Sequence, residues 1–147
     1  MGIEEILKER GIYIGKTQGD SMQPMLREGQ DTIVIVKPQF PLKKYDLPVY
    51  RRGDHLTMHR IVRVTKNGKY VICGDNRVHL ERDITEDSII GVLAGFYRDG
   101  VFISCSDQQY LAYAKKICRR YCVRLVRHYL LSVVQKFQRI WASIFQS

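Results

Sequence analysis

Hydrophobic and polar residues alternate along much of the chain between residues 11 and 105, which is the period of a half-buried strand. The run DTIVIVK at 31–37 is rich in β-branched residues, and LTMHRIVRV at 56–64 alternates between two faces. We expect strands at 11–18, 31–37 and 56–64, and a weaker one within DLPVYRR, where Pro48 interrupts the pattern. Residues 2–10 read as a short helix before the first strand.

Two hairpins are predicted by their turn residues. Asn67-Gly68 leads into KYVIC, and Asp99-Gly100 joins IIGVLAGFYR to VFISC. No alternation of strands with long helical segments occurs in this region, so a parallel sheet with crossover helices is not expected. The pattern therefore predicts a mainly β body.

The hydrophobic period changes to that of a helix after the last predicted strand. No Gly or Pro occurs beyond Gly100. Apolar residues recur at helical spacing from Tyr110 to Leu125, with basic residues opposite them. Past His128 the apolar positions shift to another face, which carries Phe137 and Trp141. We expect an amphipathic helical segment that is kinked, or folded into a helical hairpin, near His128.

Charge separates the same two regions. The chain has 147 residues and a formal net charge of +9, and residues 107–147 hold eight Lys or Arg against one acid, Asp107. The remaining residues are nearly balanced in charge. We therefore divide the chain into a β domain at 1–106 and a basic amphipathic tail at 107–147. Such a tail favours an anionic membrane surface as its partner. The alternative is a helix that packs its apolar stripe on the β body and leaves its basic face in solvent. Nucleic acid is not favoured, because no recognised binding motif accompanies the charge.

Other sequence features exclude several classes. The four cysteines lack zinc-site spacing, since the only close pair, Cys118 and Cys122, lies one helical turn apart. We expect reduced cysteines, no metal and no organic cofactor. The first ten residues hold five charges and no apolar signal-peptide core. Uncharged stretches such as 129–135 are far shorter than the ~20 residues of a spanning helix, so we expect a cytoplasmic chain.

Three polar segments could together carry hydrolytic chemistry. They are GDSMQP around Ser21, MHRIV around His59 and CGDNR around Asp75. Serine hydrolysis needs a hydroxyl nucleophile, a base to take its proton and a group that orients the base. We assign these roles to Ser21, His59 and Asp75, with the backbone N–H of Ser21 as the oxyanion donor. We expect Met22 and Pro24 to shape the turn and line a substrate cleft.

Each assignment has a structural alternative. Ser21 alone would be a turn residue, and Asp75 could serve only an Asx-type turn. His55 competes with His59 as the base but sits in a predicted solvent-facing turn. Asp20 is expected to form the turn, and Arg60 to make a structural ion pair or face solvent.

Taken together, the three segments resemble the conserved boxes of type I signal peptidases. SMQPM resembles the nucleophile box, HRIVRV the base box in its histidine form, GDNR the third box and SIIGVL the strand after it. The histidine form is that of endoplasmic-reticulum-type and archaeal enzymes. LexA-like self-cleaving repressors share the fold and the GDSM turn but use a lysine base. The resemblance covers roughly residues 15–95 and implies a coiled β-sheet or partial barrel. It also implies a substrate bound in extended form, with small residues before the cut.

The chain departs from signal peptidases at two points. Gly19 stands where these enzymes often carry a second serine that donates to the oxyanion. We also expect no N-terminal membrane anchor of the kind found in these enzymes. We expect the tail to replace that anchor by peripheral attachment to the cytoplasmic face of the membrane.

The preferred interpretation is a serine endopeptidase that cleaves a peptide or precursor protein. The main alternative is a catalytically weak or inactive module of the same fold that binds a peptide or a membrane. A LexA-like regulator is disfavoured, because only 20 residues precede Ser21.

Overall fold

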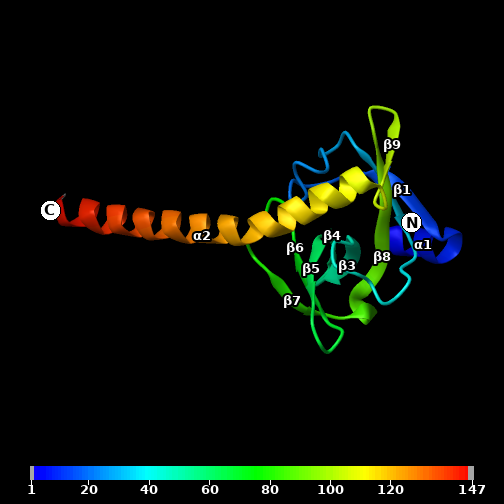
Figure 1. Ribbon diagram of the computed structural model, residues 1–147, viewed down its shortest axis with the longest axis horizontal. Coiled ribbons are helices and arrows are strands. Elements are labelled where there is room, and N and C mark those ends of the chain that lie inside the picture. The colour runs from blue at the N-terminus through cyan, green and yellow to red at the C-terminus, as the bar shows by residue number, and fades with distance from the viewer. Residues whose placement is uncertain (1, 146–147) are drawn as a thin grey trace.

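The computed structural model describes residues 2–145, except for the side chains of residues 122 and 143–145. The described residues form nine strands in two antiparallel sheets, with a short helix α1 (Ile3–Arg10) at one end and a long helix α2 (Gln108–Phe145) at the other (Figure 1). The expectation of a mainly β fold with a C-terminal helix is confirmed.

The larger sheet runs in the order β1-β2-β8-β3-β4, and β9 pairs with β8. Its strands are β1 (Ile12–Lys16), β2 (Thr32–Val36), β3 (Pro48–Arg52), β4 (His55–Met58), β8 (Ile89–Arg98) and β9 (Val101–Ser104). The smaller sheet consists of β5 (Arg60–Val64), β6 (Tyr70–Cys73) and β7 (Glu81–Ile84), and a 3-10 turn, Glu86–Ser88, leads into β8. Strands β1 and β4 are the two end strands of this order. Each therefore has one edge that pairs with no other strand of that order.

The predicted strand at 56–64 is divided at His59. Residues before it form β4 of the larger sheet, and residues after it form β5 of the smaller sheet. His59 is therefore the residue at which the chain passes from one sheet to the other, and it is buried there.

Both hairpins are present. Strand β5 pairs with β6, and β8 pairs with β9. The turn between β8 and β9 has positive φ at Asp99 (50°) and Gly100 (84°). A two-residue hairpin turn of the preferred hand requires positive φ at both central positions, which Asp and Gly tolerate better than most residues.

Two groups of buried side chains hold the body together. One lies between the larger sheet and the helices and includes Leu7 of α1, Ile35 of β2, and Tyr110 and Ala114 of α2. The other lies between the two sheets. It consists of Leu42, Tyr50, Ile61, Tyr70, Ile72 and Ile89. Full burial of a large apolar side chain stabilises a fold by about 1.5–3 kcal/mol, so the first turns of α2 are part of the folded body.

Helix α2 is continuous over its 38 residues, so the predicted helical hairpin is wrong. Its first turns cross the body and the remainder extends away from it (Figure 1). Tyr110, Ala114 and Tyr121 are buried, whereas most described side chains beyond Tyr121 are exposed. No helix within the described residues is both long enough and apolar enough to cross a membrane.

Candidate active site

Ser21 lies in the turn that connects β1 to β2 and is half-buried. The turn is anchored by three side chains that are buried in the core against the larger sheet, those of Met22, Met25 and Leu26. A backbone hydrogen bond from Leu26 N to Met22 O, 3.0 Å long, closes the segment after the serine. Apolar anchoring of the residues that directly follow the serine fixes the position of the Ser21 backbone.

A second turn, at residues 74–77, holds the serine turn from the other side. The N–H of Asn76 donates to the carbonyl oxygen of Ser21 at 2.8 Å. Arg77 forms an ion pair with Asp20, the residue before the serine. Two of the three segments singled out in the sequence are thus bonded directly to one another.

His59 approaches the serine turn at Gly74. A Cβ atom placed on Gly74 would lie 2.8 Å from the Ser21 carbonyl oxygen and 3.2 Å from Cδ2 of His59. Only a residue without a side chain leaves room for both groups, because real Cβ atoms are essentially never found below 3.0 Å from such a neighbour. The backbone of Ser21 and the ring of His59 therefore border the same small space at Gly74. The described residues show no hydrogen bond between the Ser21 hydroxyl and the His59 ring.

Glu81, the first residue of β7, is the carboxylate that contacts His59. Its Oε1 lies 2.7 Å from Nδ1 of His59 and accepts a hydrogen bond from the Tyr50 hydroxyl, also at 2.7 Å. The Tyr50 oxygen is 3.1 Å from the same Nδ1. Because a carboxylate can only accept, Nδ1 must carry the proton in neutral His59, which leaves Nε2 unprotonated. This is the tautomer that a general base needs.

Burial and Glu81 act in opposite directions on His59. Burial lowers the pKa of the imidazole because it disfavours the charged form, and the hydrogen bond and negative charge of Glu81 raise it. The net direction is a pKa below the ordinary value of 6.5. His59 is therefore neutral at pH 7 and able to accept a proton.

The structure corrects the role predicted for Asp75. Its Oδ1 and Oδ2 accept hydrogen bonds from Nε and Nη2 of Arg60, each at 2.8 Å, so Asp75 pairs with Arg60 and not with His59. Both side chains of this ion pair are fully buried. The physical reason is the alternation of side chains along the chain: His59 turns toward Glu81, and the next residue, Arg60, turns toward the 74–77 turn.

Helix α2 completes the surroundings of this buried pair. The Tyr113 hydroxyl donates to Oδ2 of Asp75 at 3.2 Å, and Nη1 of Arg60 donates to the Tyr110 hydroxyl at 3.0 Å. Arg124 donates to the backbone oxygen of Asp75. A buried ion pair needs such additional partners, because desolvation of two charges is costly. The helix thus supports the turn that contacts both Ser21 and His59.

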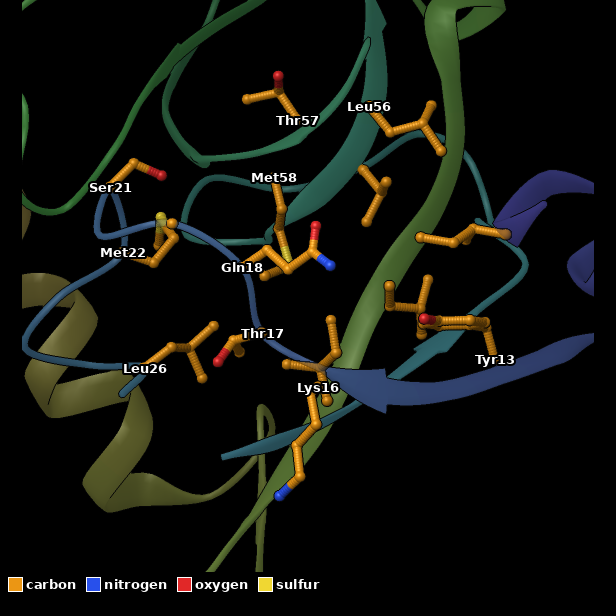
Figure 2. A pocket seen from close by; sticks show the side chains of 15 residues that line it. Tyr13, Lys16, Thr17, Gln18, Ser21, Met22, Leu26, Leu56, Thr57 and Met58 are labelled. Carbon is orange, nitrogen blue, oxygen red and sulfur yellow. The ribbon is translucent and has the colours of Figure 1, made fainter. Parts of the chain in front are cut away.

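A pocket of about 320 Å³ opens beside Ser21. Figure 2 shows the Ser21 side chain at one end of it, with the hydroxyl directed inward. Edge strands β1 and β4 both contribute to its walls through Lys16 and Thr57. Most of the deeper lining is apolar. It comprises Met22, Leu26, Ile33, Ile35, Val49 and Met58.

The remaining candidates lie elsewhere. Met22 lines the pocket beside Ser21, whereas Pro24 is exposed and does not line it. His55 is exposed at the β3–β4 turn, and His79 and His128 are exposed as well. Among the described residues, no group of three or more His, Cys, Asp or Glu could hold a metal ion.

Sequence reasoning missed Glu81 and Tyr50. Neither belongs to a motif, and Glu81 begins a strand that has few hydrophobic residues to mark it. The position of Glu81 follows from the antiparallel order of β5, β6 and β7 in the structure, which pairs Ile61 with Ile72 and Ile72 with Glu81. This register places Glu81 in line with Ile61 across the smaller sheet. Ile61 lies two residues after His59 in the chain, and alternate residues of a strand face the same side.

The mainly β body with its serine turn is a serine peptidase-like fold. Comparison with protein families identifies which one: a family model described as Peptidase S24-like matches residues 3–94. The chain therefore belongs to the Peptidase S24-like family, and the resemblance to the LexA and signal peptidase superfamily is confirmed. No curated protein or solved structure was found to match the chain.

Proposed function

We propose that this protein is a serine endopeptidase in which Ser21 is the nucleophile, His59 the general base and Glu81 the group that orients the base. The observation that carries the proposal is that the Ser21 backbone oxygen and the His59 ring both border Gly74, with Glu81 on Nδ1 of the imidazole. The Peptidase S24-like family membership supports a serine hydrolase.

In this mechanism, Oγ of Ser21 forms a bond to the carbonyl carbon of the peptide while its proton passes to Nε2 of His59. The Glu81 carboxylate stabilises the imidazolium that forms. His59 then gives the proton to the leaving amine as the C–N bond breaks. A water molecule, deprotonated by His59, releases the acyl group, and Oγ recovers its proton.

The developing oxyanion needs a positioned donor. Within the described part of the chain, the backbone N–H of Ser21 donates no hydrogen bond, so it is free to donate to substrate. An oxyanion-hole donor typically contributes a factor of about 10² to 10³ in kcat. Gly19 offers no side-chain hydroxyl for this purpose, and its N–H is already bonded to Glu28 at 2.7 Å.

The proposed substrate is a peptide or precursor protein bound in extended form. The pocket beside Ser21 lies between two strand edges, β1 and β4, which could hydrogen-bond an extended main chain. Its apolar lining suits a small or medium-sized apolar side chain next to the cut. A signal peptidase-like specificity for small residues is compatible with these contacts.

The test is fluorophosphonate labelling together with cleavage of a peptide library by the full chain. Ser21→Ala should abolish labelling, and Ser21→Ala and His59→Ala should each remove nearly all cleavage. Combining them should cost little more, because the two residues act as a unit. His55→Ala, a change at an exposed histidine, is the matched control and should retain activity. Full cleavage by Ser21→Ala would overturn the proposal.

A peptide-binding module without efficient catalysis is the second candidate. The observation that favours it is that the described residues show no hydrogen bond from the Ser21 hydroxyl to His59. Catalytic hydrogen bonds often tighten only when substrate is bound, so this geometry is also compatible with an enzyme. Peptides that bind in the pocket without being cleaved, together with a Ser21 that does not react with fluorophosphonate, would favour the binding module.

A further inference from the structure

The two ends of helix α2 present different faces to their surroundings. Near its start, one face is buried in the body through Tyr110, Ala114 and Tyr121, which recur at spacings of four and seven residues. The opposite face carries Lys116 and Arg119, and both are exposed. Spacings of three and four residues keep side chains on the same face of a helix.

The opposite face becomes apolar as soon as the helix leaves the body. Continuing from Arg119 in steps of three or four, the next residues on that stripe are hydrophobic. They are Val123, Val126, Leu130, Val134 and Phe137. Of these, Val123, Val126, Leu130 and Phe137 are between 58% and 68% exposed. The shift of the apolar stripe seen in the sequence is therefore an exchange of faces within one continuous helix.

Basic residues gather where the apolar stripe begins. Lys115, Lys116, Arg119 and Arg120 line one shallow depression on the helix, and Arg127 lies beside Val123, Val126 and Leu130 in the next. The sequence contains no Asp or Glu after Asp107. A second copy of this helix would bring like charges together and could form no interhelical ion pairs, so the charge favours an anionic partner over self-association.

We propose that this face of α2, with its basic residues Lys115, Lys116 and Arg119 and its apolar stripe from Val123 to Phe137, docks on the surface of an anionic membrane. The apolar side chains enter the boundary between headgroups and acyl chains, and the basic side chains contact the anionic headgroups. The helix lies in the plane of the surface, and the face packed on the β body is turned away from the lipid. This proposal is independent of catalysis, because the docking face is opposite the face of α2 that packs on the body through Tyr110, Ala114 and Tyr121.

The test is co-sedimentation of the full chain with vesicles of phosphatidylcholine alone or mixed with an equal amount of phosphatidylglycerol. We expect binding to the anionic vesicles at low salt, little binding to phosphatidylcholine and weaker binding as salt is raised. Replacing Lys115, Lys116 and Arg119 together by Gln should weaken binding by roughly 100-fold, because each basic residue near such a surface contributes about five-fold.

A pair of charge-matched variants separates the docking face from the rest of the helix. Leu130→Asp with Phe137→Asp places two acids on the apolar stripe and should abolish binding. Ser132→Asp with Gln135→Asp adds the same charge on the other side of the helix and should retain most of it. Circular dichroism of both variants checks that the helix and body are folded.

Equal loss of binding in the two double variants would overturn the docking face, and equal binding to both kinds of vesicle would overturn the anionic partner. Self-association is measured on the same samples by light scattering. A chain that binds no vesicles, but changes from dimer to monomer in the Leu130→Asp and Phe137→Asp variant, would show that a second copy covers the stripe.

Discussion

At the scale of single residues, the site depends on two neighbours that face opposite ways. His59 turns to Glu81 and Tyr50, and Arg60 turns to Asp75. Gly74 lies against both the serine turn and the imidazole, and its missing side chain leaves room for the two groups.

Gly74→Ala should lower kcat/KM by roughly 100-fold or more, because small displacements of catalytic groups have effects of that size. The added Cβ would lie 2.8 Å from the backbone oxygen of Ser21, so the serine turn would have to move. The measurement is the rate of peptide cleavage and of fluorophosphonate labelling. Gly2→Ala is the matched control, since a Cβ there meets nothing within 4 Å. Unchanged rates in Gly74→Ala would contradict the close approach of Ser21 and His59.

Glu81→Gln should reduce kcat by roughly 10³- to 10⁴-fold, as expected when the carboxylate behind a catalytic histidine loses its charge. The variant should also move the acid limb of the pH profile to lower pH, because Glu81 raises the pKa of His59. Measuring kcat/KM against pH tests both effects. If Glu81 had a purely structural role, the variant would lose activity but the acid limb of its pH profile would not move.

Asp75→Asn should instead act mainly on stability, through the buried Arg60.

At the scale of elements, α2 combines a packed segment with a projecting one. Ala114→Arg should destabilise the fold by several kcal/mol, because Ala114 is fully buried in the core of the body and an unpaired charge there is costly. Val126→Arg adds the same charge at a position that is 58% exposed and should change the free energy of unfolding by no more than about 0.5 kcal/mol. Urea unfolding of both variants is the measurement. Similar effects of the two substitutions would contradict the division of α2 into a packed and a projecting part.

At the scale of the whole molecule, the burial of His59 at the junction of the two sheets makes the free energy of unfolding depend on pH. The pKa of His59 is lowered in the folded chain, whereas the unfolded chain titrates at the ordinary value of about 6.5. Between these two values the unfolded state binds more protons. The free energy of unfolding should therefore fall as pH is lowered through and below 6.5, and recover as pH rises. Comparing unfolding curves of the natural chain and His59→Gln isolates this effect. The same pH dependence in both proteins would show that His59 does not contribute it.

The sequence by itself determined most of the strands, the hairpin turns and the segments that carry Ser21 and His59. Strand period and turn chemistry are local properties, so 31–37 and the Asp99-Gly100 hairpin could be predicted from neighbouring residues alone. The segments around Ser21 and His59 could be recognised because their residue types and order resemble a known family. The helical period of the tail was also visible, and of the kink or hairpin that the change of face near His128 suggested, the continuous helix excludes the hairpin.

Only the tertiary structure decided which carboxylate contacts His59 and which contacts Arg60. Asp75 was the obvious candidate because it lies in a motif, but the register of β5, β6 and β7 brings Glu81 to His59 and leaves Asp75 with Arg60. A shift of one residue reverses the face of every side chain in a strand, and such a register depends on pairing between distant segments. The contacts of Tyr110 and Tyr113 with the buried pair likewise depend on where α2 crosses the body, which no local pattern specifies.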